Sequence, residues 1–114
     1  MSALTVTLSR QLVLEAPVQA PDGAGGFARS WQALGTVWAE VTSLTGRERD
    51  GGEVSLATAR YRITVRGVPH GAEQRPVAGQ RFVEGARVFA IQSVSERDAK
   101  GRYLQCLAVE EVAT

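Results

Sequence analysis

Residues 59–68 read ARYRITVRGV, and apolar and polar side chains alternate along most of their length. In an extended chain, successive side chains point to opposite faces of a sheet, so this period of two predicts a half-buried β-strand. The expected apolar face comprises Ala59, Tyr61, Ile63 and Val65, and the opposite face comprises Arg60, Arg62, Thr64 and Arg66.

The same period recurs before this strand, in residues 36–44, which read TVWAEVTSL. Val37, Ala39 and Val41 are expected on one face, and Trp38, Glu40 and Thr42 on the other.

Four other segments complete the expected set of strands. They cover residues 10–18, 27–33, 80–94 and 102–109, and a tight turn at Glu84 and Gly85 divides the third of them. The first two flank the sequence PDGAGG at residues 21–26, whose Asp and Gly residues are typical of a hairpin tip. About six to seven short strands with regular turns predict an all-β fold, a small antiparallel β-barrel or sandwich.

One long segment, residues 45–58, has neither the period of a strand nor the apolar stripe of a helix. Loops of this length are uncommon in compact domains and usually serve a function. We therefore expect one long projecting loop here. Its charged residues are Arg47, Glu48, Arg49, Asp50 and Glu53.

Length and composition bound the class of protein. The chain has 114 residues, 44% of them hydrophobic and 22% charged, so we expect a single folded domain over residues 1–114. The net charge of +1 argues against a nucleic-acid binder with a clustered basic face. Because no apolar run reaches the length of a membrane span and no signal peptide is recognisable, we expect folding in the reducing cytoplasm and no membrane contact.

Residues suited to catalysis or metal binding are scarce. The only histidine, His70, lies in a polar loop, and the only cysteine, Cys106, lies in an apolar run typical of a buried strand. The glycine-rich turn at residues 22–26 precedes a strand, whereas a phosphate loop opens a helix. We therefore expect no catalytic site, no cofactor and no metal, and predict that the protein is not an enzyme.

Tryptophan and arginine provide the candidate interface residues. The two tryptophans can pack in the core or contact another subunit, where this residue type is enriched. The arginines of residues 59–68 can pair with carboxylates, or can follow a phosphate backbone at spacings of about 7 Å. Since no aromatic residue is expected between them on the same face for base stacking, the first interpretation is favoured. The candidate subunit interface comprises Trp31, Trp38, Arg60, Arg62 and Arg66.

Several segments resemble one known family in their order and spacing. Trp31 followed by TVWAEV at residues 36–41 is the most recognisable. The others are QLVLEAP at residues 11–17, DGAGGF at 22–27, LTGRE at 44–48, RYRITVR at 60–66 and RFVEGARVFAI at 81–91. Together they resemble the phage head–tail joining family, also called head-closure or stopper proteins, which includes gene-transfer-agent relatives.

The resemblance implies a connector subunit of the virion neck, assembled in the bacterial cytoplasm. Such subunits form a homo-oligomeric ring, a hexamer or a dodecamer, below the portal or its adaptor and above a tail-completion or tail-tube protein. They join capsid to tail, and packaged double-stranded DNA passes through the ring without sequence-specific recognition. By the same resemblance, residues 45–58 would line or gate the DNA channel.

Two other classes of function are compatible with a small all-β chain. An OB-type small barrel would bind nucleic acid through the face that carries Arg60, Arg62 and Arg66, with a steep salt dependence. An enzyme or small-ligand barrel has the least support, because the residues do not assemble into a nucleophile, a base and an oxyanion site.

Overall fold

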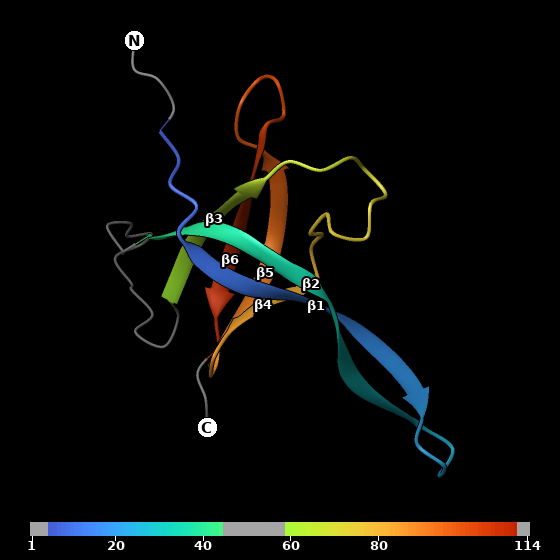
Figure 1. The fold of residues 1–114 in the computed structure, drawn as a ribbon. Helices are drawn as coiled ribbons and strands as arrows, with labels where there is room; N and C mark the ends of the chain where they lie inside the picture. The colour runs from blue at the N-terminus through green and yellow to red at the C-terminus, as the bar shows by residue number, and fades with distance from the viewer. Residues whose placement is uncertain (1–4, 45–58, 112–114) are drawn as a thin grey trace, which may run out of the picture.

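The structure is a computed structural model that describes residues 5–44 and 59–111. Its six antiparallel strands pair in the order β1-β2-β3-β6-β5-β4 and close into a barrel (Figure 1). The strands are β1 (Arg10–Pro21), β2 (Phe27–Ser43), β3 (Ala59–Arg66), β4 (Arg81–Glu84), β5 (Arg87–Glu96) and β6 (Tyr103–Glu110). The predicted all-β fold is confirmed, and the closed strand order selects the barrel over the sandwich.

The barrel closes because β1 pairs with both β2 and β4. Leu12 lies opposite Val37 of β2, and Leu14 lies opposite Phe82 of β4. Phe82 in turn faces Phe89 across the β4–β5 hairpin. The apolar faces of the strands thereby meet in one core. Its fully or almost fully buried side chains are Leu12, Leu14, Ala39, Ile63, Val65, Phe82, Phe89, Ile91, Leu104, Cys106 and Ala108.

The alternation of residues 59–68 is confirmed in the centre of β3, where Ile63 and Val65 enter the core. Thr64 differs from the expectation. It points away from the core, yet it is buried as well, and Arg97 from the turn after β5 donates a long hydrogen bond from Nη1 to its Oγ1 at 3.4 Å. The outer face of β3 is therefore covered at its middle and exposed at its ends.

The two strands predicted over residues 27–33 and 36–44 are one continuous strand, β2. The prediction of a break was wrong because a β-bulge interrupts the period of two. The register between β1 and β2 shifts between Leu14 and Glu15, and Gly35, with φ of 151°, takes a backbone conformation that other residues rarely adopt. A bulge bends its strand while pairing continues on both sides.

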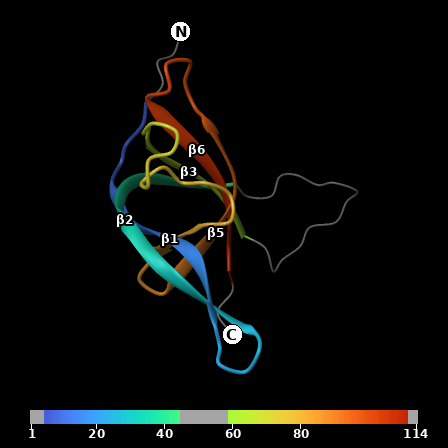
Figure 2. The ribbon, with the colours of Figure 1, turned by 90° about the vertical axis from the view of Figure 1, so that its right-hand side faces the viewer.

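Beyond the bulge, β1 and β2 leave the barrel as a two-stranded hairpin, residues 15–33, termed the arm. Glu15 is the last residue of β1 that pairs with β4, and β2 meets β3 only from Ala39 onward. Among the described residues, both edges of the arm beyond Glu15 are thus without a strand partner. Figures 1 and 2 show the arm projecting away from the barrel wall.

The tip of the arm follows the predicted turn. Asp22 accepts hydrogen bonds at Oδ1 from the backbone N–H groups of Ala24, at 2.8 Å, and of Gly26, at 3.0 Å. Gly23 and Gly25 have φ of 83° and 87°, which glycine adopts without steric cost. The tip is therefore a narrow turn of small residues held by one carboxylate.

The predicted long loop, residues 45–58, lies outside the described residues, and so do the five charged side chains named for it. No helix that could cross a membrane occurs in the part of the chain that the structure describes.

Candidate assembly surfaces

The base of the arm is tied to the barrel through Trp31. Two guanidinium groups lie close to its indole ring, that of Arg81 at 4.0 Å from the ring centroid and that of Arg29 at 4.8 Å. Arg81 also donates from Nε to Glu15 Oε1 at 2.8 Å, which links β4 to β1. Cation–π contacts contribute about 0.5–1 kcal/mol each at exposed sites, so these contacts add to the pairing of β1 and β2 at the base of the arm. Trp31 is half-buried within its own chain.

The tip of the arm presents Phe27, whose side chain is 69% exposed. It lies opposite Pro21 in the last pair of the hairpin, directly after the glycine-rich turn. The end of the arm therefore carries a large apolar side chain with little cover.

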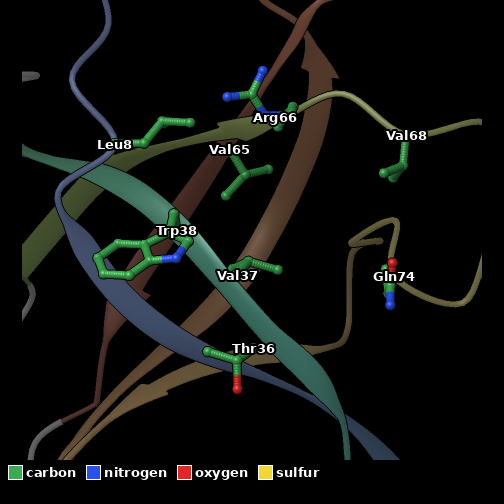
Figure 3. A pocket seen from close by; sticks show the side chains of 8 residues that line it. All are labelled: Leu8, Thr36, Val37, Trp38, Val65, Arg66, Val68 and Gln74. Carbon is green, nitrogen blue, oxygen red and sulfur yellow. The ribbon is translucent and has the colours of Figure 1, made fainter.

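The second large exposed side chain, Trp38, is 53% exposed and lines a pocket on the barrel wall (Figure 3). This pocket, termed the Trp38 groove, has a volume of about 550 Å³. It lies where β2 and β3 diverge, below the segment that follows β3. Its lining residues are Leu8, Thr36, Val37, Trp38, Val65, Arg66, Val68 and Gln74. Five of them are apolar, and Arg66 is the only charged one.

The arginines of β3 do not form one continuous face. Arg66 is exposed and lies in the Trp38 groove, whereas Arg60 is exposed near the other end of the strand, opposite Val109. Arg62 is half-buried, and its Nε is enclosed without a hydrogen-bond partner among the described residues. Of the predicted interface residues, the structure thus brings together Trp38 and Arg66, and separates them from Arg60 and Trp31.

The end of the barrel remote from the arm carries four charged side chains and one tyrosine, termed the end cluster: Arg10, Glu84, Arg87, Glu110 and Tyr61. Arg10 donates to both oxygens of Glu84, at 3.0 and 2.6 Å. Arg87 donates to both oxygens of Glu110, at 2.8 and 3.1 Å, and reaches the Tyr61 hydroxyl at 3.3 Å. Bidentate pairs of this kind hold their geometry firmly.

The titration of the end cluster follows from these bonds. The hydrogen bond from Arg10 holds the pKa of Glu84 below its ordinary value, and that from Arg87 does the same for the pKa of Glu110. The same bonds raise the pKa of each guanidinium. All four of these shifts favour the charged forms, as expected for ion pairs that join strands.

The remaining reactive side chains are placed as structural residues. Cys106 is buried in the core, and burial raises the pKa of its thiol to about 12, which keeps it in the unreactive thiol form. His70 is exposed in the segment between β3 and β4. Within residues 5–44 and 59–111, no three His, Cys, Asp or Glu side chains gather where they could hold a metal ion.

Sequence reasoning missed both the end cluster and the stack at the base of the arm. Glu84 lies 74 residues from Arg10, and Arg81 lies 66 residues from Glu15. The sequence shows only that Arg and Glu are frequent at strand ends. Which of these residues pair depends on the register between strands that are distant in sequence, and no local pattern predicts that register.

Comparison with known proteins places these surfaces in context. Residues 4–111 match the family model described as phage head completion protein. A chain of the solved virion of a native gene transfer agent particle is 54% identical, with a TM-score of 0.78, and the match covers 95% of this chain and 98% of that one.

A protein of Shigella flexneri 2a, solved in solution, has the same fold. It is 24% identical with a TM-score of 0.67, and the match covers 94% of this chain and 96% of that one. No curated protein matches this chain.

Proposed function

Since this chain belongs to the phage head completion protein family, we propose that it is a structural component of the neck of a tailed phage or gene transfer particle. The supporting relative is 54% identical over nearly the whole of both chains and comes from a virion. The protein would act by assembling with its neighbours, and no catalytic turnover is needed.

In finer detail, we propose a ring of six or twelve copies that joins capsid to tail. The ring would lie below the portal or its adaptor and above a tail-completion or tail-tube protein, with packaged DNA in its channel. The segment that would line or gate the channel is residues 45–58, with Arg47, Glu48, Arg49, Asp50 and Glu53. The two arginines and three acidic residues of this segment nearly balance, which suits this role, because a strongly basic lining would bind the phosphates of passing DNA.

The division of the molecule into a closed barrel and a projecting arm supports this proposal. A closed barrel has no open edge along which subunits could pair without control. The arm, in contrast, places a contact surface away from the barrel. Two dissimilar surfaces on one chain make head-to-tail contacts, and these generate a ring when the rotation between subunits closes.

Removal of this chain from a particle-producing strain tests the proposal. We expect filled or leaking heads that are not joined to tails, and DNA delivery that falls to background. Supplying the wild-type chain in the same strain should restore joined particles. Normal joining of heads and tails without the chain would contradict the proposal.

The alternative, nucleic-acid binding through Arg60, Arg62 and Arg66, is tested separately on the purified chain. Tight DNA binding whose affinity falls steeply with salt would favour it. Triple replacement of these arginines by glutamine would then abolish binding.

A further inference from the structure

We propose that the tip of the arm docks into the Trp38 groove of a second copy of this chain. The inference rests on the proposed ring and specifies the contact that joins one subunit to the next. Phe27 of one copy would insert beside Trp38 of the neighbour.

The arm tip has the shape of an insertion element. Phe27 is 69% exposed, and the turn before it is rich in glycine. Apart from their chain neighbours, no atom of the described residues lies within 4 Å of the positions where Gly23 and Gly25 would carry a Cβ. The backbone of the tip can therefore approach another surface closely. The paired strands and the stack around Trp31 hold the tip in place before contact, which lowers the entropy lost on binding.

The Trp38 groove has the matching properties. Its volume of about 550 Å³ lies within the range of pockets that enclose a ligand group. Its apolar lining includes Trp38 itself, 53% exposed, together with Val37 and Val68 (Figure 3). An aromatic side chain that enters it would bury two of the large apolar surfaces that the isolated subunit leaves in water.

Charge complementarity supports a second copy as the occupant. Asp22 is the only charged residue of the tip, residues 18–28, and Arg66 is the only charged residue of the groove. Both turn hydrogen bonds end on Oδ1 of Asp22, which leaves Oδ2 for an outside donor. Hydrogen bonds from Ala24 and Gly26 lower the pKa of this carboxyl, so it is charged at neutral pH.

An arm cannot fill the groove of its own subunit. The arm continues β1 and β2 outward, and the tip lies remote from β3 in both views of the ribbon (Figures 1 and 2). A second copy supplies a tip and at the same time offers its own empty groove to a third copy. Such heterologous contacts propagate around a ring, as a neck component requires.

Cross-linking in purified particles tests the contact. Ala28→Cys lies next to Phe27 on the arm, and Thr36→Cys lies in the groove. Cys106 is fully buried and gives no background. With the double variant A28C/T36C and a short bismaleimide, we expect a ladder of covalent multimers of this chain. Each single variant should give monomer only.

The matched control is A28C/S95C, because Ser95 is exposed on β5, across the barrel from the groove. A ladder with A28C/T36C and none with this control supports the contact. Particles that contain the chain but give no ladder, or an equal ladder with the control, overturn it. A cross-link to a different particle protein overturns the choice of a second copy as occupant. Absence of the chain from particles overturns the proposed function itself.

Substitution of the docking residue provides an independent measurement. Phe27→Ser should reduce incorporation of the chain into particles at least tenfold, while Val77→Ser, which removes another exposed apolar side chain, should leave it unchanged. Both variants should melt at the temperature of the wild type, because both side chains are largely exposed. Normal incorporation of the Phe27→Ser chain would overturn the docking contact and leave the proposed function standing.

Discussion

The barrel and the arm are made from the same two strands, yet they are stabilised in different ways. Within the barrel, β1 and β2 each have two neighbours and bury residues such as Leu12, Leu14 and Ala39. In the arm, the same strands have only each other, and most side chains are exposed. The arm is held by a turn at Asp22 and a stack at Trp31, not by a core.

On the proposed function, this difference separates two tasks. The barrel stabilises the fold through its core, and the arm would offer an exposed surface to a partner. A two-stranded hairpin is only marginally stable by itself in water. We therefore expect contact with a partner to stabilise the arm further. Substitutions in the barrel should therefore affect folding, and substitutions in the arm should affect assembly.

The largest contrast is expected between two phenylalanines. Phe82→Ala leaves a cavity in the core and should lower the free energy of unfolding by about 3–5 kcal/mol. Phe27→Ala, at the exposed arm tip, should change it by less than about 0.5 kcal/mol. Urea unfolding of the purified chain measures both, and equal losses would remove the distinction between barrel and arm.

Two glycines provide the next contrast. A Cβ on Gly67 would overlap the carbonyl oxygen of Gly101, so Gly67→Ala should cost about 1–3 kcal/mol. A Cβ on Gly26 in the arm would lie 3.1 Å from Oδ2 of Asp22, a side-chain atom that can move aside. Gly26→Ala should therefore be close to neutral in the same thermal or urea unfolding measurement. A neutral Gly67→Ala would show that the segment after β3 can shift.

The end cluster predicts how stability depends on pH. The pKa of Glu84 and of Glu110 is lowered in the folded chain, so their contribution is complete above the ordinary value of 4.5 and is lost as pH falls through the lowered values. Glu110→Gln should lower the free energy of unfolding by about 1 kcal/mol near neutral pH. In this variant, the free energy of unfolding should also fall less steeply as the pH is lowered. Unfolding curves at a series of pH values test this. If the free energy of unfolding falls equally steeply with pH in the variant, other carboxyl groups cause the loss of stability in acid.

The smallest expected effect is local. Arg81→Ala removes the closer cation–π partner of Trp31 and the bond to Glu15. Amide exchange in the arm should accelerate up to about tenfold, as expected for about 1 kcal/mol, while exchange in β3 and β6 stays the same. Hydrogen exchange followed by mass spectrometry resolves the two regions. An equal acceleration of amide exchange in the arm, β3 and β6 would mean that the contacts of Arg81 stabilise the whole barrel.

Much of the fold was predictable because it depends on local patterns in the amino-acid sequence. The alternation around Ile63, Val65 and Ala39 identified the core-facing residues, and the Asp and Gly residues after Pro21 identified the turn of the arm. The family resemblance, carried by the segments around Trp31 and residues 36–41, is confirmed by the match over residues 4–111.

What could not be predicted depends on pairing between distant strands. The continuity of β2 was hidden because the bulge at Gly35 breaks the period. Thr64 is contacted by Arg97, which belongs to the turn after β5 and is distant from Thr64 in the sequence. The roles proposed for Trp38 and Arg66 differ from those of Arg60 and Arg62 only through their positions around the barrel.

If this chain joins head to tail, it must lie at the neck of the particle. We would label the chain at its C-terminus, purify native particles and image them by negative staining. We expect label at the neck, between capsid and tail, on joined particles. Label on the capsid surface or tail tip, or a chain that is absent from particles and free in the cytosol, would contradict it.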